Sequence, residues 1–256
     1  MAKRILGYAL KLTALITVYN EAKFLDCCLE SIKDHVDSIV VVEGSYQENI
    51  RLGKPPRSED ETEEVIHKFM DRNEDKRITL LHYNEESDAQ QRNAGLEEIK
   101  DQKDIDFCMI VDGDEVYTPE MFKLIKAIMR TNQDVFYHTC RTFVGDFNTY
   151  CKQQFPRLFR LYEDTEFTND NFVRSNGKEW PDLSKTIINL QYFHYGFLKG
   201  NDKFLDKKKW WESRFGKGQF NYDWYVDTEG KITPTGHDLY QFTGKHPKVV
   251  QDKFGL

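Results

Sequence analysis

The sequence predicts an α/β protein with a mostly parallel central sheet in its first half and a mixed sheet in its second half. Two observations predict this fold class. Four apolar runs of strand length alternate with four helical patterns up to about residue 133, and such alternation is typical of parallel strands joined by right-handed crossovers. From residue 134 onward, strand-like segments continue while polar, irregular segments replace the helices.

Residues 107–117 are the stretch around which the chain is organised. Five apolar residues predict a strand buried on both faces, and Asp112, Asp114 and Glu115 follow at once. Because strand side chains alternate, we expect Asp112 and Asp114 to point the same way and to share one cation. Oxygen ligands without Cys or paired His favour Mg²⁺ or Mn²⁺. The alternative is an ordinary acidic turn between a strand and a helix.

The remaining elements follow from hydrophobic periodicity and helix-start signals. Capping boxes are expected to start helices at Ser58 and at Ser87, and Thr118 caps the helix after the acidic cluster. A loop is expected over residues 44–57. Strands are expected at residues 12–18, 38–43, 78–83, 107–111, 134–140, 157–162 and 186–195, and the first helix starts at residue 22.

Composition limits the classes of partner. The chain has 256 residues and a net charge of −7, which fits one large domain and argues against nucleic acid as the main partner. Five cysteines without metal-binding spacing indicate reduced thiols and a cytoplasmic setting. No run of apolar residues approaches the length that spans a bilayer.

Six short segments follow one another in the order and spacing that are typical of a known family. Together they resemble the family 2 glycosyltransferases of the GT-A fold, over roughly residues 12–200. The segments are TVYNE at 17–21, EGS at 43–45, QRNAGL at 91–96, DGDE at 112–115, FPRLFR at 155–160 and FHYG at 193–196.

This resemblance implies a Rossmann-like, nucleotide-diphospho-sugar transferase fold in one domain. Residues 1–133 would be the nucleotide-binding half, 134–200 the acceptor and metal half, and 201–256 a C-terminal appendage. The implied activity is inverting transfer of a sugar from a UDP-type or GDP-type donor to a glycan or lipid-linked acceptor, with Mn²⁺ or Mg²⁺ on the diphosphate.

The resemblance also implies roles for individual residues. The nucleotide-sugar site would include Thr17, Tyr19, Glu21, Glu43, Arg92, Asp112 and Gly113, and the metal ligands would be Asp112, Asp114 and His194. The family's second strand usually ends in an aspartate, whereas this one ends in Glu43, which leaves the base undetermined. The alternative for His194 is a core histidine whose ring is hydrogen-bonded to the backbone.

The acceptor hydroxyl needs a general base, because its pKa lies far above 7. By analogy with related enzymes, a carboxylate after the FPRLFR strand is expected in this role. Asp170 is the first candidate, followed by Glu179 and Asp182, with Glu115 as an outsider. Arg157 and Arg160 alternate on the preceding strand, where they either clamp a phosphate or pair with nearby acids.

Two other functions fit an acid-edged α/β sheet: a sugar nucleotidyltransferase and a non-catalytic nucleotide- or carbohydrate-binding module. The first normally has a Gly-rich basic loop after its first strand, and residues 17–21 contain neither glycine nor a basic residue. The Lys-Trp segment at 207–211 suggests peripheral contact with the inner face of a membrane, or else a helix packed on the catalytic half. The sugar, the acceptor and the oligomeric state are not determined by the sequence.

Overall fold

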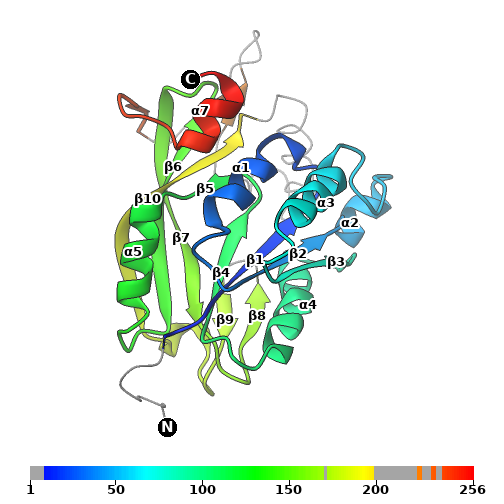
Figure 1. The fold of residues 1–256 in the computed structure, drawn as a ribbon, viewed down its shortest axis with the longest axis vertical. Coiled ribbons are helices and arrows are strands. Elements are labelled where there is room, and N and C mark those ends of the chain that lie inside the picture. The colour runs from blue at the N-terminus through cyan, green and yellow to red at the C-terminus, as the bar shows by residue number, and fades with distance from the viewer. Residues whose placement is uncertain (1–8, 170–171, 199–223, 227–231, 235–237) are drawn as a thin grey trace.

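The computed structural model describes residues 9–169, 172–198, 224–226, 232–234 and 238–256. Within these ranges the central feature is a nine-stranded sheet in the order β3-β2-β1-β4-β7-β6-β10-β5, with β13 also pairing with β7 (Figure 1). Two small hairpins, β8–β9 and β11–β12, lie outside this sheet.

The strands of the sheet are β1 (Leu12–Val18), β2 (Ser38–Glu43), β3 (Ile78–His82), β4 (Phe107–Asp112), β5 (Glu115–Val116), β6 (Val135–Val144), β7 (Thr149–Arg160), β10 (Lys185–Phe197) and β13 (Tyr240–Gln241). The hairpin strands are β8 (Glu166–Asn169), β9 (Phe172–Arg174), β11 (Trp224–Val226) and β12 (Ile232–Pro234). The helices are α1 (Ala22–Ile32), α2 (Gln47–Arg51), α3 (Thr62–Arg72), α4 (Asp88–Asp101), α5 (Pro119–Ile128), α7 (Lys248–Phe254) and the 3-10 helix η1 (Trp180–Asp182).

The first half is a parallel sheet between two helical layers. Alternate residues of β1 face opposite cores: Ala14 and Ile16 pack with α1, α3 and α5, and Leu15 packs with α4. The pairing places Thr17 of β1 level with Asp112 of β4, so polar residues gather at one carboxyl edge. Open α/β sheets bind ligands at this edge.

The second half is mixed and determines which residues reach that edge. β7 is antiparallel to both β4 and β6, and β10 is parallel to β6. β4, β6 and β10 therefore run in the same direction. The two-residue strand β5 pairs with the end of β10, which sets Glu115 opposite His194 and Val116 opposite Phe193.

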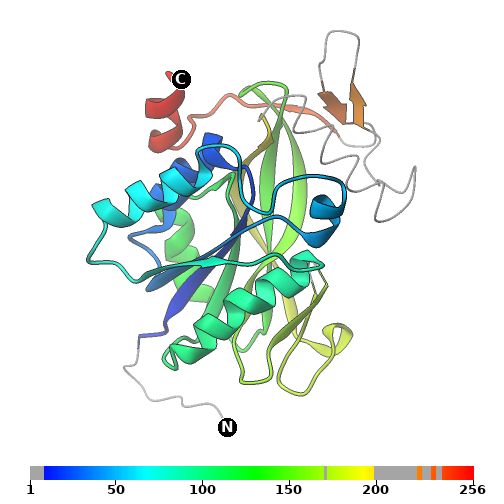
Figure 2. The same cartoon turned by 90° about the vertical axis from the view of Figure 1, so that its right-hand side faces the viewer.

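The C-terminal segment adds a third, aromatic core. The ring of Phe24 in α1 stacks on Tyr195 at 5.1 Å and lies 4.9 Å from Phe254 in α7. Figure 2 shows α7 beside α1. His246 connects this segment to the core by two hydrogen bonds. Its Nδ1 lies 2.8 Å from Tyr195 Oη, and its Nε2 lies 2.8 Å from the carbonyl oxygen of Phe147.

The α/β fold class predicted from the sequence is confirmed, and three details were wrong. The helix expected to start at Ser58 starts at Thr62, because the Ser58 hydroxyl is used by Glu43 instead of a helix end. The loop expected over residues 44–57 contains α2. β7 begins at Thr149, well before the predicted residue 157. By contrast, Ser87 caps α4 as predicted, accepting from the N–H of Gln90.

No helix in the described part of the chain is long and apolar enough to cross a membrane. The Lys-Trp segment at residues 207–211 lies outside the described residues.

Candidate active site

The structure brings Asp112, Asp114 and His194 together at the carboxyl edge of the sheet. Each offers one ligand atom, and these atoms lie within 4.8 Å of one another. His194 Nε2 is 3.2 Å from Asp114 Oδ1. Asp114 and His194 are buried, and Asp112 is half-buried. Side chains from distant parts of the chain thus form one donor set.

Hydrogen bonds behind His194 determine which ring nitrogen faces this set. The hydroxyl of Thr142 donates to Gln153 Oε1 (2.6 Å) and lies 3.1 Å from His194 Nδ1. Since a hydroxyl has only one proton to donate, Nδ1–H is the donor toward Thr142. Nε2 is thereby directed at Asp114, the arrangement that proteins use to orient a metal-binding imidazole.

The electrostatics of the donor set favour a cation. Burial lowers the pKa of His194, but the Asp114 carboxylate outweighs burial and raises this pKa to about 10. A divalent ion binding here would take the place of the proton on Nε2. Two carboxylate oxygens and one imidazole nitrogen are ligands that Mn²⁺ and Mg²⁺ accept.

Gly196 leaves space beside the donor set. A Cβ on this residue would lie 2.7 Å from His194 Nε2 and 3.0 Å from Asp114 Oδ2. The two candidate ligand atoms therefore border a space that any side chain would fill. Donor chemistry and geometry both fit a bound metal ion.

Arg157 lies beneath the acids and does not face the solvent. It is 3% exposed, and its Nη2 contacts both Asp112 Oδ2 and Glu115 Oε1 at 2.5 Å. Burial raises the pKa of Asp112, but Arg157 and Arg92 outweigh burial and lower it. Burial of Glu115 is the larger effect and raises its pKa to about 7. Of the two sequence-based alternatives for Arg157, pairing with acids holds and phosphate clamping does not fit this geometry.

Arg160 belongs to the opposite edge of the sheet. Its guanidinium donates to the carbonyl oxygens of Gln133 (3.3 Å) and Met129 (3.2 Å), where α5 ends. A cation at a helix C-terminus satisfies carbonyls that have no partner inside the helix. Neither alternative predicted for Arg160 is correct.

Arg92 and Asp88 form an ion pair beside the metal-ligand candidates. Arg92 Nη2 lies 2.8 Å from Asp88 Oδ2 and 3.9 Å from Asp112 Oδ1. Asp88 also accepts from the hydroxyls of Tyr46 (2.8 Å) and Thr17 (3.4 Å). Asp88 was not among the residues predicted for the site. The i,i+4 spacing of Asp88 and Arg92 was the available signal, since such residues are neighbours on one helix face.

The turn after β1 holds the loop before α3. Tyr19 Oη donates to the carbonyl of Pro55 (3.0 Å), and the N–H of Glu21 donates to Thr62 Oγ1 (2.7 Å). Asn20 Oδ1 accepts from the N–H of Glu59 at 2.8 Å. Loop residues far along the chain are therefore positioned by the carboxyl end of β1.

Glu43 is enclosed by the same loop. It is 0% exposed, and its Oε1 accepts from both the N–H (2.8 Å) and the hydroxyl (2.7 Å) of Ser58. Its direct hydrogen bond to a base stays a prediction, and here the loop covers the carboxylate.

Gly113 allows a close approach by another part of the protein. A Cβ here would lie 3.0 Å from Val18 Cγ1 and 3.3 Å from Glu21 Cβ. The missing side chain therefore lets the turn after β1 pack against the Asp112–Asp114 turn.

Two of the three candidate bases lie at the edge of the sheet opposite the acid cluster. Glu179 and Asp182 precede β10, whereas His194 lies near its other end. The nine residue steps from Lys185 to His194 span about 30 Å of strand. Glu179 is also 63% exposed and lies near Arg174. Neither carboxylate can reach an acceptor bound at the acid cluster.

Asp170 lies outside the described residues, and β8 before it is held against α4. The side-chain amide of Asn93 donates to the carbonyl of Phe167 (2.8 Å) and accepts from its N–H (2.8 Å). Phe167 also packs under the guanidinium of Arg92, with 6.0 Å to its ring centroid. β8 therefore lies beside the site before it ends at Asn169.

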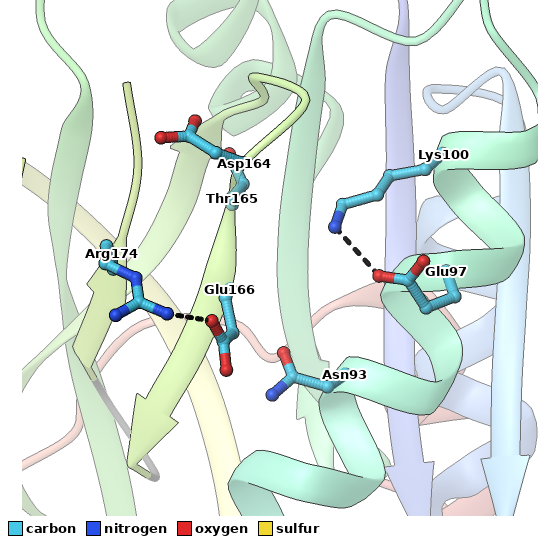
Figure 3. A pocket seen from close by; sticks show the side chains of 7 residues that line it. All are labelled: Asn93, Glu97, Lys100, Asp164, Thr165, Glu166 and Arg174. Carbon is cyan, nitrogen blue, oxygen red and sulfur yellow. Dashed lines mark hydrogen bonds and ion pairs between the residues drawn. The ribbon is translucent and has the colours of Figure 1, made fainter. Parts of the chain in front are cut away.

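A surface hollow of about 380 Å³ lies between α4 and β8 (Figure 3). Four of its charged residues form pairs, Lys100 with Glu97 at 2.8 Å and Arg174 with Glu166 at 2.5 Å. The fifth, Asp164, accepts from the backbone N–H groups of Asn176 and Gly177. None of its lining residues belongs to the acid cluster. The hollow is therefore separate from the candidate active site.

The α/β fold, with its largely parallel sheet and carboxylates at the carboxyl edge, is consistent with the GT-A type. Residues 57–183 match the model of a family described as Glycosyl transferase family 2. The chain thus contains a glycosyltransferase family 2 domain, which classes it as a glycosyltransferase.

Solved structures show a more distant likeness. Two crystal structures of S. aureus TarS, one covering its residues 1–349, match with 14% identity and a TM-score of 0.46. Each match covers 83% of this chain, and 67% and 41% of those chains. A 4-diphosphocytidyl-2C-methyl-D-erythritol synthase from Anaerococcus prevotii matches with 13% identity and a TM-score of 0.37, over 59% of this chain and 70% of that one. No curated protein sequence matches the chain.

Proposed function

We propose that the protein is an inverting, metal-dependent glycosyltransferase that moves a sugar from a nucleoside diphosphate donor to an acceptor hydroxyl. The observation that carries this proposal is the convergence of Asp112, Asp114 and His194 at the carboxyl edge of the sheet. Their donor atoms suit a divalent cation, and the chain contains a family 2 glycosyltransferase domain.

Asp112, Asp114 and His194 would hold Mn²⁺ or Mg²⁺, which stabilises the negative charge of a departing diphosphate. The protein prepares these ligands in advance. Arg157 holds Asp112 from below, and the Thr142–Gln153 pair orients His194. Preorganised ligands of this kind need no rearrangement when charge develops.

The donor, of the UDP or GDP type, would lie along the carboxyl ends of β1 and β4. We assign Arg92 to its phosphates or ribose, with Thr17 and Asp88 fixing the guanidinium. Tyr19, Glu21 and Gly113 line the turn next to this position. Glu43 contributes by holding the Ser58 loop, which borders the nucleotide end of the site.

In the proposed reaction, the acceptor oxygen bonds to the anomeric carbon as the bond from that carbon to the diphosphate breaks. Attack opposite the leaving group inverts the configuration. The acceptor's proton passes to a carboxylate, and we assign Asp170 to this role because Glu179 and Asp182 belong to the other edge. Glu115 is engaged by Arg157 and by the hydroxyl of Tyr117 (2.9 Å), and it is fully buried.

We further propose a glycan or lipid-linked acceptor and a cytoplasmic setting, with peripheral membrane contact through residues 207–211. The alternatives, a sugar nucleotidyltransferase and a non-catalytic binding module, receive no specific support from the site. The turn after β1 has no glycine-rich phosphate loop, which a nucleotidyltransferase would use.

The test is incubation with a panel of nucleotide sugars and Mn²⁺, followed by detection of products. Free nucleoside diphosphate supports transfer or slow donor hydrolysis, pyrophosphate supports a nucleotidyltransferase, and saturable binding without turnover supports a binding module. Asp114→Ala should abolish metal-dependent donor binding while leaving the fold intact. Asp101→Ala, at an exposed position near the end of α4, is the matched control. Wild-type turnover by Asp114→Ala would refute the proposal.

A further inference from the structure

A second group of possible metal ligands lies at the outer end of the parallel sheet. Glu43 ends β2, His82 ends the neighbouring strand β3 in register with it, and Glu63 lies in the first turn of α3. Each offers one ligand atom within 4.8 Å of the other two. His82 Nε2 and Glu63 Oε1 are 3.0 Å apart. None of the three belongs to the acid cluster at β4.

The buried member of this group has an unsatisfied oxygen. Oε1 of Glu43 accepts two hydrogen bonds from Ser58, whereas Oε2 is buried and has no hydrogen-bond partner. Arg57 Nη1 is 3.8 Å from Oε2, which is too far for a hydrogen bond. A fully buried carboxylate oxygen without a donor is costly, and a metal ion would satisfy it.

We propose that Glu43, Glu63 and His82 form a second metal site that takes Zn²⁺. Imidazole nitrogen and carboxylate oxygen are both zinc ligands, and three protein ligands leave a fourth position for water. The ion at the acid cluster would share a diphosphate with the donor, which suits Mg²⁺ or Mn²⁺. No phosphate ligand is proposed for the second group, and the higher intrinsic affinity of nitrogen and oxygen ligands for zinc then decides.

Access and charge are both suitable for a divalent ion. The side chains of Glu63 and His82 are 40% and 39% exposed, so an ion can enter from solvent between them and replace their direct contact. Two carboxylates and the Arg57 guanidinium leave a net negative charge on the group. The bound ion therefore neutralises a local excess of negative charge.

The site would act as a clamp on the edge of the sheet. Among the described strands, β3 is the last on this side and pairs only with β2. Zinc bound to His82 and Glu63 would link this edge strand to the start of α3, and Glu43 would extend the link to β2. This inference does not depend on the proposed transferase activity.

Zinc binding to the full chain tests the proposal. Asp114→Ala serves as the background, because it disables the other ligand set, and Zn²⁺ is titrated in competition with a chromophoric chelator. We expect one zinc per chain in this background. Adding His82→Gln or Glu63→Gln should weaken binding at least tenfold and abolish the zinc-induced rise in Tm.

His67→Gln is the matched control and should leave zinc binding unchanged. His67 is an exposed histidine on α3, the helix that carries Glu63. Co²⁺ in place of zinc provides a spectroscopic readout: visible absorption of a four- or five-coordinate ion should be lost with His82→Gln. Two results would overturn the proposal: no saturable zinc binding, or equal affinity with and without His82. Circular dichroism shows whether each variant is folded.

Discussion

The backbone N–H of Tyr195 donates to the carbonyl oxygen of Asp114 at 3.0 Å. This main-chain hydrogen bond joins the residue after His194 directly to the residue that His194 faces. Together with the pairing of β5 and β10, it fixes the separation of the two side chains without relying on the side chains themselves. The donor set is therefore built into the sheet.

Gly196→Ala should weaken metal binding with little effect on stability. The new methyl group would press on His194 Nε2 and Asp114 Oδ2 and turn the imidazole away from the carboxylates. Changes next to metal ligands typically cost about 10–100-fold in affinity. Calorimetric titration with Mn²⁺ measures the effect, and Ile187→Ala, at an exposed position of β10, is the control. Unchanged affinity would mean that His194 is not a ligand.

Arg157→Met should destabilise the fold strongly. It removes the cation that contacts both Asp112 and Glu115 and leaves buried negative charge without compensation. Breaking a buried ion pair from one side costs about 3–5 kcal/mol. Urea unfolding at pH 8 measures the loss. Adding Glu115→Gln should recover part of it, because Gln at this position has neither a charge to bury nor a proton to take up on folding. Simple additivity of the two changes would contradict the coupling.

His138 should make the fold sensitive to acid. The residue is 0% exposed, and neither ring nitrogen has a hydrogen-bond partner in the described part of the chain. Burial, assisted by Arg157, lowers the pKa of His138 from 6.5 to about 3. Between these values the unfolded chain binds a proton that the folded chain does not, so stability falls as pH falls, by about 1.4 kcal/mol per pH unit.

The variant His138→Met should remove this contribution. Its free energy of unfolding, measured from pH 7 to pH 4, should decline less steeply than that of the wild type. The difference in slope should be about 1.4 kcal/mol per pH unit, the contribution of one proton. His67→Met, at an exposed position of α3, controls for loss of a histidine elsewhere. Parallel curves for His138→Met and wild type would show that the imidazole is protonated in the fold.

Substitution of the candidate bases should separate them by location. Glu179→Gln and Asp182→Asn should leave turnover within about twofold of wild type, because both precede β10 at the edge remote from the metal ligands. Asp170→Asn should lower turnover by about 10²–10⁴-fold, the usual contribution of a general base, while sparing donor binding. A pre-steady-state assay with a donor selected from the nucleotide-sugar panel measures both quantities. Normal turnover by Asp170→Asn would remove it from this role.

Much of the parallel half was predictable from residue patterns. The strands at residues 12–18 and 38–43 have the predicted bounds, because buried apolar runs stop abruptly at polar residues. The proximity of Asp112 and Asp114 followed from their spacing. The short helix α2 was missed because none of its residues is buried, so the sequence shows no apolar periodicity there.

Other features depend on contacts that sequence patterns do not encode. Ser58 looks like a helix cap, but it serves the buried carboxylate of Glu43. Arg157 resembles a phosphate ligand until its burial under two acids is known. Glu179 and Asp182 were candidates only while the direction of β10 was unknown. In each case a long-range contact or a strand direction decided the outcome.

The order of strands makes the turn between β4 and β5 depend on strands that come later in the chain. β4 and β5 are neighbours in sequence, separated by Gly113 and Asp114, yet the hydrogen-bonded path between them runs through β7, β6 and β10. β5 can therefore pair with the sheet only after β10 is in place. During synthesis, a nascent chain lacking residues after 184 could form the parallel half but would leave Asp114 unanchored. The ligand set of Asp112, Asp114 and His194 would thus be completed late, after the parallel half has already folded.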